Sequence, residues 1–205
     1  MGLITLELFT TLDLVARSPG SPEEDPENFP YGGWQAPLLD EVSGAQVAAA
    51  YEGTDALLLG RRTYDIFAAY WPRQHDSFAT LFNTIPKYVA SRGTPELQWD
   101  GSTQLGPDLA TAVRGIRDRH ENIKVVGSLD LVQTLLRQKL FDRLDLWVHP
   151  ILLGVGKKVF ADGTVPSNLT LLEPPTVGGK GTVYLRYGLD AGTPEVGNMD
   201  DVSSD

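Results

Sequence analysis

Short apolar runs alternate with helical segments through the middle of the chain, and this alternation constrains the fold more than any other feature. The apolar runs lie at residues 55–59, 87–90 and 123–126. Segments with helical character follow them at residues 61–69, 108–120 and 129–137, with a further short helix expected at 77–83. Strands and helices that alternate in this way form a largely parallel sheet covered by helices on both faces. We therefore expect an α/β fold.

The two ends of the chain add strands to this core. Residues 3–10 are dominated by apolar and β-branched side chains and predict a buried strand. Residues 144–149 alternate strictly between apolar and polar. Two further strands are expected at 169–176 and 182–187, on either side of the glycine-rich sequence at 178–181. This arrangement predicts an antiparallel hairpin at the C-terminal side of the sheet.

Two segments do not have a regular pattern. Residues 17–37 are rich in proline, glycine and acidic residues, and long irregular segments in compact domains are often functional. Residues 190–205 hold five acidic residues and no basic ones, so we expect a disordered acidic tail after a single domain at 1–189. After the irregular segment at 17–37, residues 40–52 predict a helix with Val42, Ala45, Ala49 and Ala50 on one side.

The composition excludes several classes of protein. Seventeen basic residues against 27 acidic ones give a net charge of −10, which disfavours binding to nucleic acid or to an anionic membrane. The chain has no cysteine, which excludes disulfides and thiolate chemistry, and its three histidines lack the spacing of metal ligands, so no metal site is expected. No apolar run approaches the ~18 residues of a membrane span. We expect a cytoplasmic protein.

The first strand-to-helix junction has the residues of a phosphate site. The buried run ends at Gly60, where the backbone can turn and approach a ligand. Arg61, Arg62 and Thr63 follow at the start of a helix, whose free N–H groups and positive dipole end favour anions. Guanidinium groups bind phosphate in a bidentate manner. The alternative is a surface helix start with solvated arginines.

Two further junctions have related chemistry. Ser91 and Arg92 follow a strand end that should lie on the same edge of the sheet, although Ser-Arg-Gly is also a common turn. Gly127 ends a β-branched strand, and Ser128 is a good helix N-cap, so that a pyrophosphate fits the N–H groups before Leu129 and Leu131. A single glycine before a helix also occurs without any ligand.

The order of these motifs resembles the dihydrofolate reductase-like superfamily. The resemblance is to the branch with the C-terminal reductase domain of the bifunctional riboflavin-biosynthesis deaminase-reductase and its stand-alone bacterial relatives. The resembling stretches are 10–13, 32–34, 59–64, 86–91, 126–128, 131–133, 150–154 and 156–157. They extend over most of the chain from residue 3 to about residue 187.

The resemblance implies a reductase that binds NADPH. Arg61, Arg62, Thr63, Ser91 and Arg92 would then recognise the ribose 2′-phosphate, and Gly127 to Leu131 the pyrophosphate. The stretch with Leu152, Leu153, Gly154 and Gly156 would line the cofactor and substrate cleft. The implied substrate is a small pyrimidine- or pterin-like heterocycle, as for 5-amino-6-(5-phosphoribosylamino)uracil reductase. Relatives often dimerise, so a homodimer is an open expectation.

Two positions depart from the family pattern. Leu14 stands where the family has a glycine after Leu-Asp, which puts a bulky side chain near the expected nicotinamide end and removes the option of a positive φ. The double glycine of dihydrofolate reductases is Gly127-Ser128 here. Asp13 is the candidate for a polar substrate contact or for proton delivery, and its alternative role is to cap a turn. Trp34, Tyr64 and Trp71 are candidate walls for a flat substrate, with core packing as the alternative.

Three functions therefore remain open. The first is an NADPH-dependent reductase. The second is a catalytically degenerate relative that binds a nucleotide or another small molecule without turnover, which Leu14 motivates. The third is an interaction module that uses the acidic tail.

Overall fold

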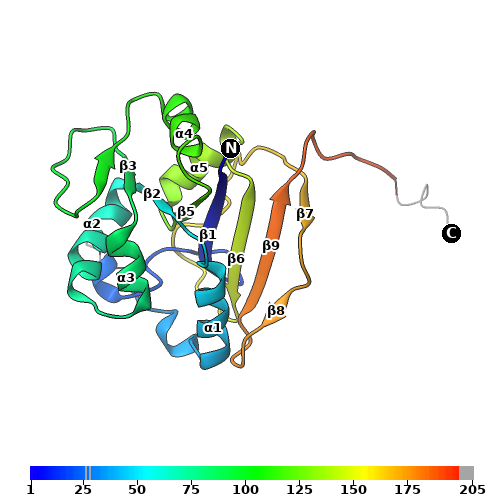
Figure 1. Ribbon diagram of the computed structural model, residues 1–205. Coiled ribbons are helices and arrows are strands. Elements are labelled where there is room, and N and C mark those ends of the chain that lie inside the picture. Colours follow the sequence, from blue (N-terminus) through cyan, green and yellow to red (C-terminus); the bar gives the residue numbers. More distant parts are fainter. Residues whose placement is uncertain (26, 28, 199–205) are drawn as a thin grey trace.

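The computed structural model describes residues 1–25, 27 and 29–198 and shows one sheet with helices on both faces (Figure 1). The strands are β1 (Leu3–Thr11), β2 (Ala56–Gly60), β3 (Lys87–Ala90), β4 (Ser102–Gln104), β5 (Asn122–Val126), β6 (Arg143–His149), β7 (Leu169–Leu171), β8 (Thr176–Val177) and β9 (Val183–Leu189). The helices are α1 (Glu41–Ala50), α2 (Arg61–Tyr70), α3 (Ser77–Thr84), α4 (Leu109–Arg117) and α5 (Leu129–Arg137). The strand order is β4-β3-β2-β5-β1-β6-β9-β7, and β8 also pairs with β9.

The strand directions confirm the expected fold. The neighbours from β4 to β6 pair in parallel, whereas β9 pairs antiparallel with β6. Two details differ from the expectation. The edge strand β4 was not predicted, because its Ser-Thr-Gln sequence has no apolar pattern. The expected strand at 169–176 is divided into β7 and β8, because Pro174 and Pro175 between them cannot donate to a ladder.

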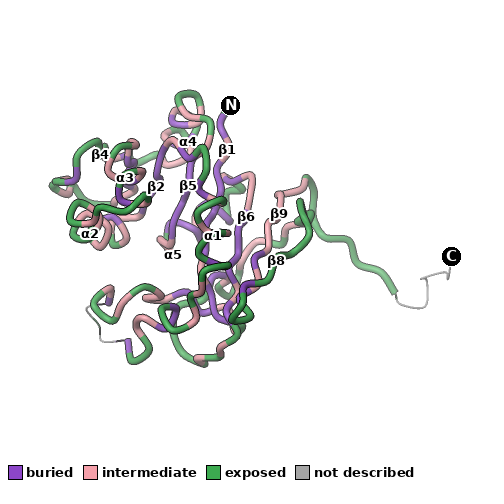
Figure 2. The backbone as a smooth tube through the Cα atoms, turned by 60° about the horizontal axis from the view of Figure 1, so that its bottom comes forward, coloured by how far each residue is buried: buried purple, intermediate pink, exposed green. Residues whose placement is uncertain are grey.

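Two apolar layers hold the helices to the sheet, and Figure 2 shows the central strands as largely buried. One layer packs α4 and α5 against β1, β5 and β6, with residues such as Val113, Val132 and Leu135 fully buried. The other packs α2 and α3 against β2 and β3, around Tyr64 and Phe82. Together these layers fix the strand ends from which a site can be built.

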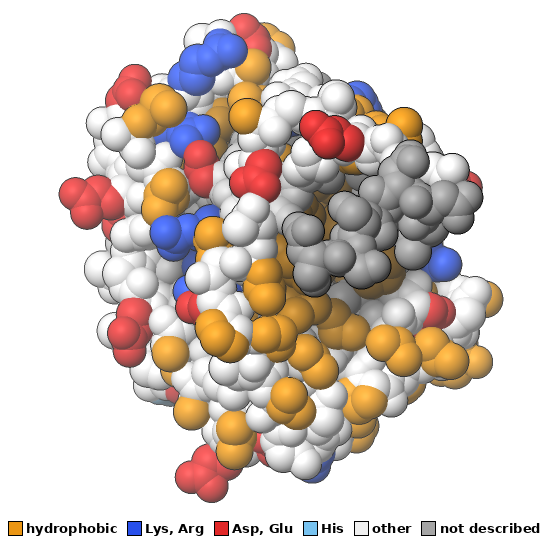
Figure 3. Space-filling model, turned by 90° about the vertical axis from the view of Figure 1, so that its right-hand side faces the viewer, with side chains coloured by type: hydrophobic (Ala, Val, Ile, Leu, Met, Phe, Trp, Pro, Cys, Tyr) orange, Lys and Arg blue, Asp and Glu red, His pale blue; other side chains and the backbone are white. Residues whose placement is uncertain are grey.

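Helix α1 does not follow the expected pattern. Val42, Ala45 and Ala49 are exposed, and Ser43 is the residue that α1 buries. The apolar side predicted for this helix is therefore wrong as a core face. The physical reason is that much of the sheet surface beside α1 is polar, so only Val47 of the helix packs against an apolar cluster, around Tyr51 and Phe82. Apolar side chains are also exposed at the nearby sheet edge of β7 and β8, where Val177 is 60% exposed, and Figure 3 views this side of the molecule.

The long irregular segment before α1 is tied to the loop after β6. As predicted, residues 17–37 form no strand or α-helix among those described, only two short 3-10 helices at Pro22–Glu24 and Ala36–Leu38. Val15 forms an antiparallel bridge with Lys158. Gly156 approaches the segment so closely that an added Cβ would lie 2.7 Å from Val15 Cγ1 and 3.1 Å from the Phe29 ring.

We predict that Gly156→Ala lowers the free energy of unfolding by about 2–4 kcal/mol, because the methyl group meets Val15 and Phe29 at a positive φ of 115°. Gly163→Ala is the matched control. It has a φ of 80° but nothing within 4 Å of the added Cβ, so only about 1 kcal/mol of backbone strain is expected. Urea unfolding measures both variants, and equal losses would contradict the close packing.

Candidate active site

The carboxyl ends of the parallel strands bring the predicted junctions to one edge of the sheet. Gly60 at the end of β2 pairs with Ala90 at the end of β3, so Arg61 and Ser91 leave neighbouring strands side by side. Strand β5 ends next to β1, where Gly127 N donates to Glu7 O at 3.4 Å. From the carboxyl end of β2 the chain leads through α2 and α3 to β3 on one side, whereas from β5 it leads through α5 to β6 on the other side, which makes the boundary between β2 and β5 a topological switch point. Ligands of open α/β sheets bind at such points.

Five of the predicted cofactor residues are brought together where α2 and α5 begin: Gly60, Thr63, Gly127, Ser128 and Leu131. Ser128 Oγ accepts a hydrogen bond from Gly60 N at 2.9 Å, and Ser128 N donates to Thr63 Oγ1 at 3.0 Å. A Cβ added at Gly60 would lie 3.3 Å from Ser128 Cβ and 3.6 Å from Leu131 Cβ. We call these residues the helix-terminus cluster.

The two helices of this cluster differ from the other α-helices in how they begin. Asp40, Asp76 and Asp108 cap α1, α3 and α4 by accepting a hydrogen bond from a backbone N–H. Helices α2 and α5 have no side-chain cap. The expected capping role of Ser128 is therefore wrong, because its hydroxyl is used to hold Gly60. The first-turn N–H groups of both helices, including that of Leu129, are left as donors at one point.

The backbone of the cluster is also shaped for an anion. Gly127 and Ser128 have positive φ angles of 53° and 56°. Successive residues in turn conformations of this kind direct their N–H groups into a common concavity that suits anions. Asp130 in the first turn of α5 would repel an anion, but Lys157 Nζ binds its carboxylate at 2.7 Å. The donor set therefore fits a phosphate group.

The arginines expected at the 2′-phosphate lie at this edge but have partners within the chain. Arg61 Nε contacts the carboxylate of Asp65 at 2.7 Å, one helical turn further on. Arg62 is 61% exposed and lies 3.5 Å from Glu27. Arg92 is exposed, and the neighbouring Ser91 Oγ accepts from Gly93 N at 3.2 Å. These side chains share an edge, although a phosphate would compete with Glu27 for Arg62.

Asp13 forms the second part of the site, at the end of β1. Its carboxylate accepts hydrogen bonds from Gly154 N at 2.8 Å, Leu153 N at 3.3 Å and Thr11 Oγ1 at 2.6 Å. The bond from Thr11, followed by those from the backbone, lowers the pKa of Asp13 below its ordinary value. An ionised carboxylate accepts hydrogen bonds and has no proton to deliver. The geometry thus favours the turn-capping role, in which Asp13 holds the loop at 151–156 against β1.

Leu14 adopts a backbone conformation that glycine adopts more readily than other residues. Its φ is 65°, in the left-handed region, which costs a residue with a side chain roughly 1–2 kcal/mol. Leu14 O accepts from Val159 N at 2.9 Å, which helps to hold the turn. The loss of a positive φ, which the sequence suggested, does not occur here. What differs is only the side chain.

The three aromatic residues proposed as pocket walls have different positions. Trp34 packs with Leu153 near Asp13, and its ring meets His149 edge-on at 5.2 Å between centroids. Tyr64 is a core residue that accepts from Trp99 N at 3.0 Å. Trp71 lies beyond the far end of α2, about 15 Å along the helix from the site edge. The predictions for Tyr64 and Trp71 are therefore wrong, and Trp34 stays a candidate wall.

The remaining residues of the loop at 151–156 differ in exposure and contacts. Leu152 is 69% exposed, whereas Leu153 packs against the cluster of Val15, Phe29 and Trp34. Gly154 donates to Asp13, and Gly156 is required by the close approach to Val15. Among the described residues, no three histidine, aspartate or glutamate side chains are grouped as metal ligands. Nor does the described part of the chain contain a helix that could span a bilayer.

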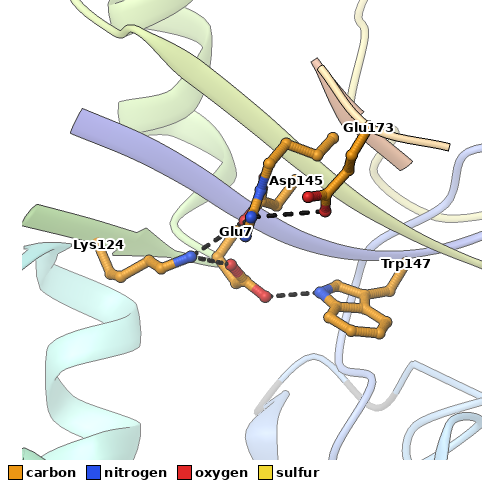
Figure 4. Close-up of polar contacts among 6 residues, drawn as sticks. Glu7, Lys124, Asp145, Trp147 and Glu173 are labelled. Atoms are coloured by element: carbon orange, nitrogen blue, oxygen red, sulfur yellow. Dashed lines mark hydrogen bonds and ion pairs between the residues drawn. The ribbon is translucent and has the colours of Figure 1, made fainter. Parts of the chain in front are cut away.

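A buried ion network, which no sequence pattern indicated, lies behind this edge under α1 (Figure 4). Lys124 Nζ donates to Glu7 Oε2 at 2.6 Å and to Asp145 Oδ2 at 3.1 Å. Trp147 Nε1 donates to Glu7, and Arg186 binds Asp145 with two nitrogens at 3.0 and 3.1 Å. Glu7 and Asp145 are fully buried. The only signal was the presence of Glu7 and Lys124 within otherwise apolar strands.

The two buried carboxyl groups have opposite pKa shifts. Burial raises the pKa of Glu7 from 4.5 to about 7, against the opposing charge of Lys124. Burial would also raise the pKa of Asp145, but the hydrogen bonds from Arg186 and the charge of Lys124 hold it below its ordinary value. Asp145 is therefore the anion of the network, and Glu7 is its titrating group.

Comparison with known proteins places these features in a family. Residues 3–183 match the model of the RibD C-terminal domain. The chain belongs to the RibD C-terminal domain family. The chain is also similar to the uncharacterized protein YyaP of Bacillus subtilis, with 27% identity over 139 residues, which cover 65% of this chain and 73% of YyaP.

Solved structures confirm the fold of this RibD C-terminal domain. A pyrimidine reductase-like protein of Corynebacterium diphtheriae superposes with a TM-score of 0.64 at 15% identity, covering 93% of each chain. Dihydrofolate reductase from Enterococcus faecalis, complexed with NADP(H), gives a TM-score of 0.57 at 15% identity, covering 93% of this chain and 98% of the reductase. The resemblance seen in the sequence motifs is confirmed, and the fold is the dihydrofolate reductase fold.

We predict that Glu7 makes the domain less stable as the pH rises. Its pKa is higher in the folded chain than in the unfolded chain, so the folded state binds the proton more tightly between the two values. This contribution to stability is complete below about pH 4.5 and is lost as the pH rises through 7. The loss between pH 5 and 8 should be on the order of 2–3 kcal/mol.

Urea unfolding at several pH values measures this slope in the wild type and in Glu7→Gln, which cannot titrate. Subtraction of the two curves isolates Glu7 from the other ionisable groups. Glu52→Gln, at an exposed position, is the control and should keep the wild-type slope. Parallel curves for the wild type and Glu7→Gln would show that the carboxyl does not titrate in this range.

Proposed function

We propose that this member of the RibD C-terminal domain family is an NADPH-dependent reductase of a small heterocyclic substrate. The observation that carries the proposal is the helix-terminus cluster, where two helices without side-chain caps begin at the switch point of the sheet. Three other α-helices of the same chain have an aspartate cap, so the free N–H groups are a local feature of this edge. Such a pair of helix starts suits a diphosphate.

Different residues of this edge would bind different parts of the cofactor. The N–H groups around Gly127, Ser128 and Leu129 would hold the pyrophosphate. Arg61, Arg62 and Thr63, which follow β2, would bind the 2′-phosphate. Ser91 and Arg92, which follow β3, would bind it as well. NADPH supplies the hydride when bound, and the protein orients it.

The nicotinamide end would lie at the other part of the site, between β1 and the loop at 151–156. Asp13 positions this loop through the N–H groups of Leu153 and Gly154. Trp34 closes the inner side next to His149. Burial lowers the pKa of His149, so the imidazole is neutral at pH 7 and adds no positive charge there. In this role Asp13 acts on the shape of the cleft and is not the source of a proton.

The strength of NADPH binding tests the proposal. Arg62→Ala should weaken NADPH by about tenfold, since one exposed, charge-assisted contact to the 2′-phosphate is lost. NADH has no 2′-phosphate and should bind almost unchanged. Isothermal titration calorimetry measures both cofactors.

Arg73→Ala, at the far end of α2, is the matched control and should change neither affinity. Equal losses for NADPH and NADH in Arg62→Ala would assign the arginine another role. An absence of NADPH binding by the wild type at high micromolar cofactor would end the proposal.

A binding protein without turnover is the second candidate, and the side chain of Leu14 is the observation that favours it. Because the turn keeps its positive φ, any effect must come from the bulk of the side chain near the expected nicotinamide. Steady oxidation of NADPH with a physiological substrate would remove this candidate. The role of the acidic tail, which lies partly outside the described residues, and a homodimer both stay predictions.

A further inference from the structure

Exposed aliphatic side chains gather around the Asp13 turn. Leu12 is 61% exposed, Leu152 is 69% exposed and Val155 is 53% exposed. Leu12 N donates to Ile151 O at 2.9 Å, and Asp13 binds the backbone of Leu153 and Gly154, so these side chains belong to two loops in direct contact. We call Leu12, Leu152 and Val155 the aliphatic rim.

The grouping distinguishes the rim from ordinary surface leucines. A single exposed leucine is common on any protein, but several on the edge where ligands bind mark an interaction site. The rim also continues inwards into the apolar cluster that contains Val15, Phe29 and Trp34, against which Leu153 packs. The exposed rim is therefore backed by a buried apolar cluster.

The charges around the rim do not suit a phosphate. Asp13 lies at its centre, and the hydrogen bond from Thr11 lowers the pKa of this carboxyl, which favours the carboxylate form. Lys157 is bound to Asp130 at 2.7 Å, and Arg17 is bound to Asp25 and, at 2.8 Å, to Glu27. The cations Lys157 and Arg17 are thus each paired with a carboxylate of the chain, which leaves them less available to a phosphate.

The opposite end of the same sheet edge has the reverse character. Arg61, Arg62 and Arg92 lie there beside the helix-terminus cluster. A net charge of −10 over the whole chain adds to the repulsion of any anion that is not met by local cations. The site thus separates a half that suits phosphate from a half with exposed aliphatic side chains around the carboxylate of Asp13.

We propose that the substrate bound at the aliphatic rim has an apolar body, is neutral or positively charged, and carries no phosphate ester. This inference rests on the proposed reductase function and narrows it. The rim would cover the apolar body, and the carboxylate of Asp13 would favour a positively charged group.

Three naphthalene derivatives with one apolar body and different head groups test the proposal. They are 2-naphthylmethanol, 2-naphthylmethylamine and 2-naphthylmethyl phosphate, which are neutral, cationic and anionic. Two-dimensional NMR titration of the full chain, with and without saturating NADPH, gives both the affinity and the resonances that shift. We expect the alcohol and the amine to shift resonances of the rim, and the phosphate to bind at least about tenfold more weakly than the amine.

Variants tie the binding to the rim. Val155→Ser should weaken the alcohol and the amine several-fold, since it removes part of the apolar cover. Val177→Ser, at a valine of similar exposure on β8, is the matched control and should leave both unchanged. Asp13→Asn should reduce the advantage of the amine over the alcohol, because the carboxylate charge is lost.

Several results would overturn the inference. One is that the naphthylmethyl phosphate binds as tightly as the amine. Another is that Val155→Ser and Val177→Ser change the affinities equally, and a third is that no probe shifts the resonances of the rim. Failure of the reductase proposal is a separate result. In that case NADPH does not bind, while the alcohol and the amine still bind at the rim in the expected order.

Discussion

The hydrogen bond from Gly60 N to Ser128 Oγ determines the geometry on which the rest of the site depends. It joins the ends of β2 and β5, which are neighbours in the sheet but 68 residues apart in the chain. Because the hydroxyl is used in this way, it cannot cap α5, and the helix keeps its first-turn donors free. This hydrogen bond therefore holds together two helix starts that both lack a side-chain cap: the hydroxyl of Ser128 binds Gly60, and Gly60 has no side chain.

A second set of contacts joins this anion-binding part to the loop at 151–156. Lys157 reaches from the loop to Asp130 in the first turn of α5, and Asp13 holds the other side of the loop against β1. The loop is thus attached to both halves of the edge. Its position relative to the helix starts is set by charged contacts at the two ends, with Gly156 packed between them.

The sequence predicted the parts of the fold that follow from local pattern. The alternation of apolar runs and helices gave the parallel sheet, and glycines at the ends of β2 and β5 marked the junctions. Side-chain choices with competing partners were not predictable. Ser128 had the chemistry of an N-cap but found Gly60, which is distant in sequence, and Tyr64 found Trp99 in the core. Glu7, Lys124 and Asp145 lie on three strands, so only the register of the sheet brings them together.

The buried ion network has a consequence for how the sheet assembles. Glu7 pairs in register with Asp145, which in turn pairs with Arg186 across β9. A shift of one residue between any two of these strands would turn a charged side chain to the opposite face, into the apolar layer under α4 and α5. A buried charge without its partner costs several kcal/mol. Misaligned arrangements of β1, β6 and β9 are therefore less stable, relative to the native one, than they would be with leucines at these positions. The charges thus select one alignment of the strands during folding.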